Sequence, residues 1–163
     1  MSPTAHSEVQ LRRIGVEDWR LWRELRLRAL EEAPYAFGST LADWQGASDT
    51  EARWRGRLSD VPFNLVAEWR KTPVGMASGT ASGPDGSVEL ISMWVAPVAR
   101  GRGVGDSLVD AIVEWAREQC AARVVLAVFQ GNEHALALYR RHGFIEFEGD
   151  SCPAAEHKLV RCL

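Results

Sequence analysis

The sequence predicts an α/β (α+β) fold with about seven strands and several helices. Two observations lead to this class. Short segments with alternating apolar and polar residues are interspersed with longer segments in which apolar residues recur every three or four positions. These segments follow one another in the order β-α-α-β-β-β-α-β-α-β-β. Because 46% of the 163 residues are hydrophobic and no linker interrupts them, we expect one domain over residues 1–163, with a mobile tail at residues 1–7.

The first half of the chain is predicted to form a strand, two helices and a hairpin. The longer helix has Trp19, Trp22, Leu25, Ala29 and Ala33 near one face, and it ends where a proline follows. In order, we expect a strand over Glu8–Ile14, a helix over Val16–Glu32, a loop over Tyr35–Asp60 with a shorter helix around Asp49–Leu58, and strands over Phe63–Trp69 and Val74–Ser82 joined by a turn at Lys71–Pro73.

Strands and helices alternate in the second half. One helix places Val104, Leu108, Ala111, Ile112 and Trp115 on a single face. The strand after it is a continuous apolar run, as expected of a buried parallel strand. In order, we expect a turn at Gly83–Gly86, a strand over Ser87–Val95, the helix that begins near Val104, a strand over Arg123–Phe129, a helix between Asn132 and Gly143, and closing strands over Phe144–Glu148 and His157–Leu163.

The segment that follows the strand ending at Val95 carries most of the functional information. It reads Val95-Ala96-Pro97-Val98-Ala99-Arg100-Gly101-Arg102-Gly103-Val104-Gly105-Asp106-Ser107-Leu108. Glycines let consecutive N–H groups approach a ligand, and a helix start offers unpaired N–H groups at the positive end of its dipole. Two arginines add charge-assisted donors. The segment is therefore predicted to bind a phosphate or pyrophosphate.

Two common phosphate-binding loops do not match this segment. A nucleotide P-loop requires Gly-Lys-Ser/Thr at its end, whereas this segment has Gly105-Asp106-Ser107. A dinucleotide fingerprint requires Gly-x-Gly-x-x-Gly near the start of a strand–helix–strand unit, whereas these glycines are spaced by two and follow the fourth predicted strand. What remains is the pattern Arg-x-x-Gly-x-Gly over Arg100–Gly105, or an ordinary glycine-rich loop between a strand and a helix.

A second motif follows at Asn132–Phe144. It reads Asn-x-x-Ala-x-x-Leu-Tyr-x-x-x-Gly-Phe, with Asn132 as the N-cap of a helix and Gly143 as its C-terminal stop. Together with Val-x-Pro and Arg-x-x-Gly-x-Gly, it resembles the signature stretches of the GNAT superfamily of acyl-CoA-dependent N-acetyltransferases. The resemblance is specific over roughly Val88–Phe147 and rests on element order elsewhere. It implies the GNAT fold, in which helices flank a central mixed, mostly antiparallel sheet of about seven strands. It also implies the transfer of an acetyl group from acetyl-CoA to a primary amine, by direct attack in a ternary complex and without a metal.

The resemblance also implies where the cosubstrate binds. The pyrophosphate is expected at the glycine-rich segment, and the pantetheine arm is expected to run along Met93–Val95 like an added strand. The expected cosubstrate-binding residues are Met93, Val95, Arg100, Gly101, Arg102, Gly103, Val104, Gly105, Asp106, Ser107, Asn132 and Ala135.

Tyr139 and Glu89 are the expected catalytic residues. Tyr139 matches the tyrosine with which family members protonate the leaving thiolate; the alternative is a buried aromatic residue whose hydroxyl has found a partner. Glu89 lies where the histone-acetyltransferase branch has a glutamate base, and strand alternation places it on one face with Ile91, Met93 and Val95. The alternatives are a glutamate that pairs with an arginine at a solvated strand end, and deprotonation of the amine by ordered water.

The resemblance also implies that the acceptor amine enters between the first two helices and the last pair of strands. Tyr35, Phe37, Trp44, Trp54 and Trp94 are the expected wall residues, because aromatic faces with a carboxylate can hold a cation. Core packing is the alternative for the tryptophans. The sequence leaves open whether the acceptor is a small amine, an amino acid, an antibiotic or a peptide. A non-catalytic acyl-CoA-binding module is the alternative to an enzyme.

Composition and charge bear on partners and location. A net charge of −3 without a basic stripe gives no support for nucleic acid, and no apolar run is long enough to span a membrane. Cys120, Cys152 and Cys162 lack metal-ligand spacing, so we expect reduced thiols in a cytoplasmic protein. The four histidines have no motif position and are expected to be structural. A homodimer is expected, because His157–Leu163 would offer an exposed strand edge.

Overall fold

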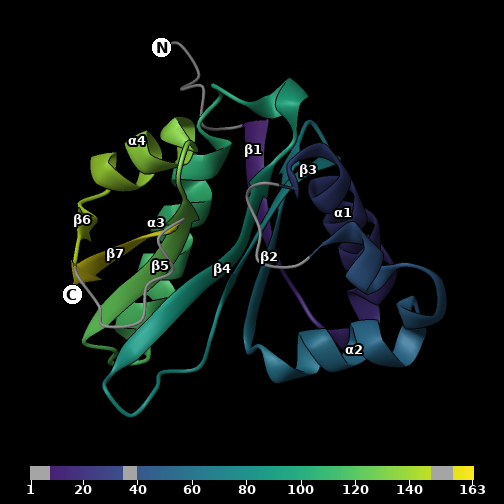
Figure 1. Cartoon of the computed structure of the whole chain (residues 1–163), viewed down its shortest axis with the longest axis horizontal. Coiled ribbons are helices and arrows are strands. Elements are labelled where there is room, and N and C mark those ends of the chain that lie inside the picture. Colours follow the sequence, from purple (N-terminus) through teal and green to yellow (C-terminus); the bar gives the residue numbers. More distant parts are fainter. Residues whose placement is uncertain (1–7, 35–39, 148–155) are drawn as a thin grey trace.

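A computed structural model describes residues 8–34, 40–147 and 156–163 of the chain. The predictions for residues 1–7, Tyr35, Phe37 and Cys152 lie outside these ranges. The predicted fold class is confirmed: within the described residues, a seven-stranded sheet is flanked by helices (Figure 1). The elements are β1 (Val9–Ile14), α1 (Trp19–Glu32), α2 (Glu51–Asp60), β2 (Phe63–Trp69), β3 (Thr72–Gly79), β4 (Ser87–Val95), α3 (Val104–Glu118), β5 (Arg123–Phe129), α4 (Glu133–Arg141), β6 (Ile145–Glu146) and β7 (Glu156–Cys162), with short 3₁₀ helices at Val16–Asp18, Leu41–Trp44, Gly46–Ser48 and Pro97–Ala99.

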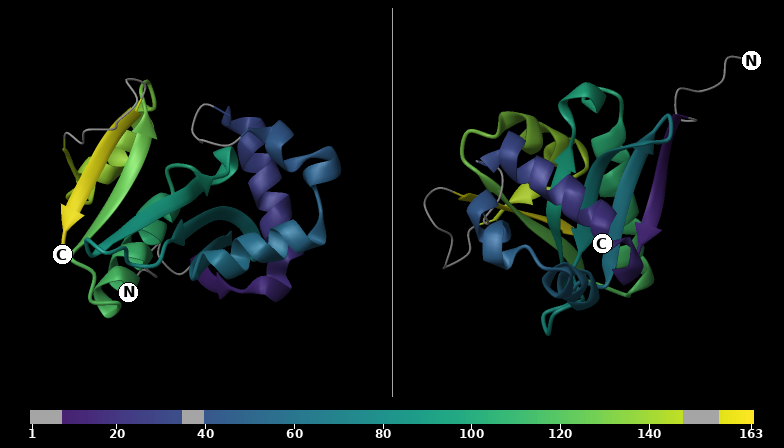
Figure 2. Two further views of the ribbon diagram at one scale, coloured as in Figure 1. Left: turned by 60° about the horizontal axis from the view of Figure 1, so that its bottom comes forward. Right: turned by 90° about the vertical axis from the view of Figure 1, so that its right-hand side faces the viewer.

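The sheet has the strand order β1-β2-β3-β4-β5-β7-β6. All neighbouring strands are antiparallel except β4 and β5, which are parallel. Helices α1 and α2 cover one side of the sheet, and α3 and α4 cover the other (Figure 1 and Figure 2). The apolar face of α3 packs closely on the sheet: Trp115 stacks on Phe63 with ring centroids 4.7 Å apart. Gly79 of β3 makes this contact possible, because a Cβ there would lie 2.9 Å from the Trp115 ring.

The hairpin between β2 and β3 differs from the prediction. Its turn residues are Arg70 and Lys71, with φ angles of 51° and 67°, so Thr72 and Pro73 belong to β3. Two consecutive left-handed residues fit a two-residue turn of type I′, whose twist matches that of the flanking strands. Such turns usually contain Asn-Gly, so Arg-Lys carries no sequence signal for one. β3 also ends earlier than predicted, at Gly79.

β4 and β5 separate along their length. This finding corrects the expectation that β5 is a parallel strand buried on both faces. They pair only from Ser87 to Glu89 of β4, opposite Arg123 to Val125 of β5. Beyond this stretch, burial along β5 alternates, and Ala127 is exposed. A parallel strand is buried on both faces only where helices cover both. Here the strands part instead and leave an open edge in the middle of the sheet.

A β-bulge interrupts β4, which corrects the predicted alternation along this strand. Met76 of β3 faces Trp94, whereas Ser78 faces Ile91, so β4 has one residue more than β3 between these pairs. The extra residue is accommodated at Ser92, which adopts a left-handed φ of 56°. Because a bulge shifts the side-chain alternation, the face shared by Glu89 and Ile91 does not continue through the end of the strand.

The last strand is not an edge strand, which removes the argument given for a homodimer. β7 lies between β5 and β6, and the strands at the two edges of the sheet are β1 and β6. β6 is only two residues long and pairs with Leu159 and Val160. The homodimer stays a prediction.

Two further findings concern the described part of the chain. Cys120 and Cys162 are exposed free thiols. Within residues 8–34, 40–147 and 156–163, none of the helices combines the length and the apolar composition needed to cross a bilayer.

Candidate active site

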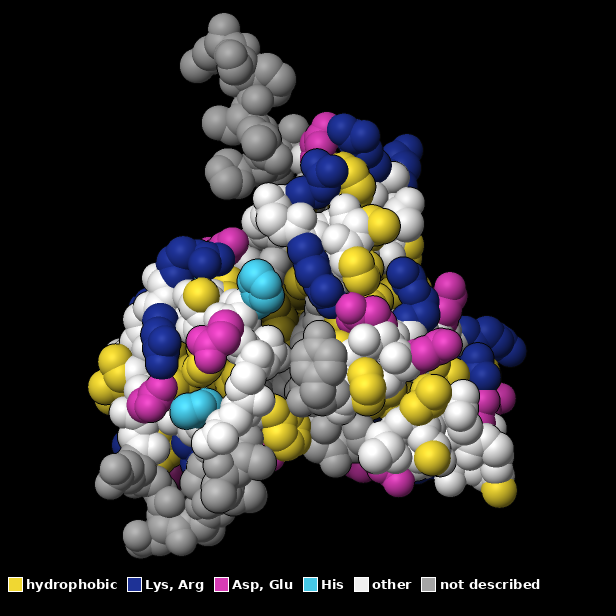
Figure 3. Space-filling model, turned by 45° about the horizontal axis from the view of Figure 1, so that its top comes forward, with side chains coloured by type: hydrophobic (Ala, Val, Ile, Leu, Met, Phe, Trp, Pro, Cys, Tyr) yellow, Lys and Arg dark blue, Asp and Glu magenta, His cyan; other side chains and the backbone are white. Residues whose placement is uncertain are grey.

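A cleft of about 1280 Å³ lies where β4 and β5 separate. On one side it is lined by the loop before α3, the start of α3, the end of β5 and α4. On the other side it is lined by α1, α2 and the 3₁₀ helix at Leu41–Trp44, with β4 between them. Figure 3 shows apolar side chains (yellow) between the two halves of the molecule on this face. The two sequence motifs therefore meet at one site.

The glycine-rich segment forms an open loop at the N-terminus of α3. Gly101 and Gly103 have left-handed φ angles of 75° and 82°, and Gly103 is the N-cap of the 15-residue helix α3. A Cβ at either glycine would have no other atom within 4 Å, so the space above the loop is free. Gly105 has a different role, because a Cβ there would lie 3.1 Å from the Leu138 side chain of α4. The first turn of α3 thus exposes N–H groups and dipole to the cleft, as an anion requires.

Arg100 lines the cleft but is held by protein groups. Its Nε donates to the Val95 carbonyl oxygen (3.0 Å) and its Nη2 to Glu32 Oε2 (2.7 Å). The same Glu32 oxygen accepts from Trp94 Nε1 at 3.0 Å. Burial alone would raise the pKa of Glu32, but the hydrogen bonds from Trp94 and Arg100 hold it below its usual value. Glu32 of α1 thereby fixes both the arginine and the end of β4.

Two predicted cosubstrate-binding residues lie outside the cleft lining. The Arg102 guanidinium lies over the Trp69 ring, 4.2 Å from its centroid. Ser107 Oγ donates to the Gly103 carbonyl oxygen at 3.1 Å, inside the first turn of α3. The other predicted cosubstrate-binding residues line the cleft: Met93, Val95, Arg100, Gly101, Gly103, Val104, Gly105, Asp106, Asn132 and Ala135.

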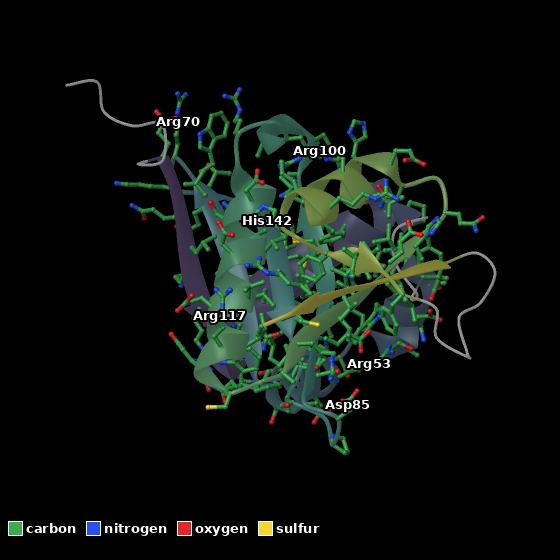
Figure 4. The ribbon with its side chains drawn as sticks, turned by 90° about the vertical axis from the view of Figure 1, so that its left-hand side faces the viewer. Arg53, Arg70, Asp85, Arg100, Arg117 and His142 are labelled. Carbon is green, nitrogen blue, oxygen red and sulfur yellow. The ribbon has the colours of Figure 1, made fainter. Side chains whose placement is uncertain are left out.

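Asp106 joins the start of α3 to the end of α4. His142 Nε2 lies 2.7 Å from Asp106 Oδ1, and Arg141 Nη2 donates to the same oxygen at 2.9 Å. Burial alone would raise the pKa of Asp106, but the hydrogen bonds from His142 and Arg141 outweigh burial, so the pKa lies below its usual value. His142 Nδ1 also lies 3.1 Å from Asp110, which agrees with the structural role expected for this histidine. Figure 4 shows His142 beside α3, below Arg100.

Tyr139 is buried on α4 and lines the cleft. Helix α4 begins as predicted: Asn132 Oδ1 accepts from the Ala135 N–H at 3.3 Å. The Tyr139 ring meets Phe144 edge-on, with centroids 5.8 Å apart. Burial raises the pKa of Tyr139 well above its usual value. The side chain is therefore a neutral phenol at physiological pH and can act as a hydrogen-bond donor.

Glu89 lies in β4 at the last position paired with β5, and its side chain is exposed at the cleft. Its backbone N–H donates to Thr80 Oγ1 at 2.9 Å, which anchors this end of the strand. The predicted base is thus placed where the two strands begin to separate.

The acceptor side of the cleft contains the predicted tryptophans together with residues that the sequence reasoning missed. Trp44, Trp54 and Trp94 line it as expected. The missed residues on this side are Trp22, Arg26 and Arg57, and His134 of α4 lines the opposite side. Arg26 follows Trp22 by four positions, and Arg57 follows Trp54 by three, so each arginine shares a helix face with a buried tryptophan. A charged residue on an otherwise apolar helix face is the sequence pattern from which Arg26 and Arg57 could have been predicted to line the site.

Arg57 joins helix α2 to the bulged strand. Its Nη1 donates to Asn64 Oδ1 (3.1 Å), and its Nη2 donates to Ser78 Oγ (3.2 Å) and Ser92 Oγ (3.1 Å). Burial lowers the pKa of Arg57 to about 10. The left-handed residue of the β4 bulge is therefore held by a buried guanidinium, which makes the bulge part of the site.

Asp49 fixes the helices that carry this wall. It accepts from Arg23 Nε (2.7 Å) and Trp54 Nε1 (2.8 Å), and so joins α1 to α2. The hydrogen bonds from Arg23 and then from Trp54 lower the Asp49 pKa from 3.8 to about 2.

Asp49→Asn is expected to lower the melting temperature at pH 7, since the amide loses the charge that pairs with Arg23. A lowered folded-state pKa stabilises the fold above the unfolded pKa of 3.8, and this stabilisation is lost as the pH falls toward 2. The difference in melting temperature from the wild type, followed by circular dichroism at pH 7, 5 and 3, should therefore narrow at pH 3. Glu24→Gln, at an exposed position of α1, is the control. A difference that stays constant across this range would contradict the prediction.

The comparison with known families decides how this arrangement is to be interpreted. The model of the acetyltransferase (GNAT) family matches residues 19–144, from the start of α1 to the residue after α4 and its C-terminal turn. The chain belongs to the GNAT acetyltransferase family. The superfamily predicted from the two motifs is thus confirmed, and the protein is an acyltransferase.

Individual relatives of this GNAT acetyltransferase share about a third of their residues with it over the aligned segments. The uncharacterized N-acetyltransferase YobR of Bacillus subtilis is 36% identical over 81 residues, which are 50% of this chain and 30% of YobR. The L-methionine sulfoximine/L-methionine sulfone acetyltransferase of Pseudomonas aeruginosa is 33% identical over 127 residues, or 76% of this chain and 69% of that protein. The chain thus spans less than a third of the length of YobR and just over two thirds of the Pseudomonas enzyme.

A solved structure shows the same fold. The PaiA N-acetyltransferase from Thermoplasma acidophilum, in complex with coenzyme A, superimposes with a TM-score of 0.75 at 14% sequence identity. The match covers 95% of this chain and 99% of the PaiA chain.

Proposed function

We propose that this acetyltransferase moves the acetyl group of acetyl-CoA to a primary amine by direct attack within a ternary complex. One observation carries the proposal: a single cleft joins the open loop before α3, the separated edges of β4 and β5, buried Tyr139 and a second wall on α1 and α2. One side offers a helix N-terminus for a pyrophosphate, and the other has space for an acceptor. The coenzyme A bound to PaiA and the amino-acid substrate of the Pseudomonas relative support this assignment.

The cosubstrate would lie along the cleft from α3 to the centre of the sheet. Its pyrophosphate would accept hydrogen bonds from the backbone at Gly101–Gly105, where neither left-handed glycine places a side chain in the way. Its pantetheine arm would follow Met93–Val95, because β4 has no β5 partner beyond Glu89. The thioester would then come close to Tyr139.

The reaction needs a neutral amine, stabilisation of the tetrahedral intermediate and a proton for the leaving thiolate. Nitrogen attacks the thioester carbon, the C–S bond then breaks, and one proton of the amine finally resides on sulfur. A buried tyrosine with a raised pKa is too weak an acid to protonate a free thiolate by itself, because a thiol has a pKa of about 8.5. We therefore assign Tyr139 a relay: it gives its proton to sulfur as it takes one from the ammonium nitrogen of the intermediate.

An assay for free thiol release tests the function. Wild-type protein, acetyl-CoA and a panel of primary amines are mixed, and coenzyme A binding is measured separately by calorimetry. Amine-dependent thiol release supports acetyl transfer. Coenzyme A binding with no release on any amine would instead support a non-catalytic acyl-CoA-binding module.

Glu89→Gln is expected to lower kcat/KM most near neutral pH, by about 100-fold if Glu89 takes the proton from the amine. The loss should shrink as the pH approaches the amine pKa of about 10, where neutral amine is already abundant. Rates measured between pH 7 and 10 check this, with Glu118→Gln at the exposed end of α3 as the control. A loss that does not change with pH would show that Glu89 positions the substrate without accepting its proton.

A further inference from the structure

Hydrogen-bond donors dominate the acceptor side of the cleft. The indole Nε1 atoms of Trp22 and Trp44 are buried and have no hydrogen-bond partner among the described residues. Both tryptophans line the cleft, and Trp22 is fully buried. Buried donors are almost always satisfied in folded proteins, so two unsatisfied N–H groups in one wall indicate a ligand that supplies acceptor atoms.

The same wall carries two buried positive charges. Burial lowers the pKa of Arg26 and of Arg57 to about 10, and the nearby charge of Arg57 lowers that of Arg26 further, whereas Asp60 raises that of Arg57. Both guanidinium groups remain protonated at neutral pH. Placing two like charges together in a poorly solvated wall is unfavourable, and a bound anion would compensate them.

Among the residues that the structure describes, few carboxylates line the cleft. The hydrogen bonds of Arg57 go to three neutral side chains, those of Asn64, Ser78 and Ser92. The described carboxylates that line the cleft are Glu89, Asp106 and Glu156. Asp106 is held by Arg141 and His142 beside the cosubstrate loop. Glu89 is exposed on β4, where the proposed function has it receive the proton of the amine.

We propose that Arg26, Arg57 and the two indole N–H groups bind the carboxylate of the acceptor, so that the substrate is an α-amino acid. A carboxylate has lone pairs for several donors, and Arg57 keeps one Nη1–H and its Nε–H after its bonds to Asn64, Ser78 and Ser92. A primary amine one carbon away from that carboxylate would point toward β4, which carries both Glu89 and the Arg57-bound Ser92. A polyamine, in contrast, would place positive charge against two buried cations. The proposal rests on the acetyl-transfer function assigned above.

The first test compares an amino acid with its neutral amide. L-methionine and L-methioninamide differ only in the group that the wall would bind, and the amine of the amide has the lower pKa, so intrinsic reactivity favours the amide. We expect wild-type kcat/KM to be about 100-fold higher for the acid, because the amide is neutral and has one acceptor oxygen, and hydrogen bonds to a charged group contribute more than those to a neutral one. The ratio should fall below about 10 in Arg57→Met and stay unchanged in Arg55→Met, which removes an exposed charge on the same helix.

Arg57→Lys covers the case in which Arg57→Met does not fold, because it keeps the charge and loses the planar set of guanidinium donors. Its acid-to-amide ratio should lie between those of the wild type and Arg57→Met. Equal rates for acid and amide in the wild-type protein would overturn the carboxylate site while leaving acetyl transfer standing.

The second test does not depend on turnover. The melting temperature of wild-type protein saturated with coenzyme A is measured with N-acetyl-L-methionine and with N-acetyl-L-methioninamide. We expect a concentration-dependent rise with the acid and little change with the amide. A rise in melting temperature with the acid alone supports the carboxylate site. If no amino acid is acetylated in the first test, that result contradicts acetyl transfer to amino acids and leaves the carboxylate site supported. Equal shifts, or no shift with either compound, would overturn the proposal.

Discussion

Tyr139→Phe is expected to lower kcat by about 100-fold or more and to leave coenzyme A affinity almost unchanged. The substitution removes one oxygen atom and keeps the ring that packs edge-on against Phe144. Because the hydroxyl is required only while the C–S bond breaks, its loss should affect the transition state and not the binding of either substrate.

The burial of Tyr139 makes this prediction sharper. A raised pKa excludes a role for its phenolate as a base at neutral pH, so the residue acts as a donor or has no chemical role. In the proposed relay, the tyrosine never becomes a full phenolate. The relay thus avoids the unfavourable transfer of a proton from a buried phenol to the thiolate of a more acidic thiol. The rate defect of Tyr139→Phe should therefore become smaller when acetyl-CoA is replaced by an acetyl thioester with a better leaving group, whose sulfur needs less protonation as it leaves.

Three measurements distinguish this chemical role from a structural one. Steady-state kinetics give kcat and KM, calorimetry gives the Kd for coenzyme A, and thermal unfolding gives the stability. We expect a large loss of kcat with the Kd and the melting temperature near wild-type values. Normal turnover in Tyr139→Phe would show that the tyrosine is only a packing residue of α4.

Gly103→Val is expected to weaken coenzyme A binding by about 100-fold or more. Gly103 is the N-cap of α3 and has a φ of 82°, a conformation in which a β-branched residue is strained. The added Cβ would meet no protein atom within 4 Å, so the protein still has room for it, but it would occupy the space proposed for the pyrophosphate. The loss of two hydrogen bonds from the backbone to the charged pyrophosphate would account for a loss of affinity of about 100-fold.

Gly46→Val is the matched control for this experiment. Gly46 also has a left-handed φ, of 65°, and also leaves open space around its Cβ position, but it lies outside the cleft lining. Both variants should lose a similar amount of stability, and only Gly103→Val should lose affinity in calorimetry. Unchanged affinity in Gly103→Val would contradict the placement of the pyrophosphate over this loop.

The amino-acid sequence by itself determined the features of this protein that depend on local structure. The glycines and arginines at Arg100–Gly105 indicated a ligand-binding loop before α3, and that loop lies at the cleft as expected, although Arg102 turns away onto Trp69. Asn132 indicated the start of α4 and thereby the placement of Tyr139. Capping, glycine conformation and helical spacing act over a few residues, so they can be inferred from neighbours in the chain.

Only the tertiary structure decided the acceptor wall, the bulge in β4 and the place of β7. Arg26 and Arg57 belong to different helices, and their common environment arises because α1 and α2 pack over one side of the sheet. Ser92 adopts its left-handed conformation where β3 and β4 differ by one residue, which depends on the partner strand and not on the sequence around Ser92. β7 pairs between β5 and β6 although β6 precedes it in the chain. Strand order, register and the meeting of distant charges depend on which surfaces pack together, and local propensities contain no information about that choice.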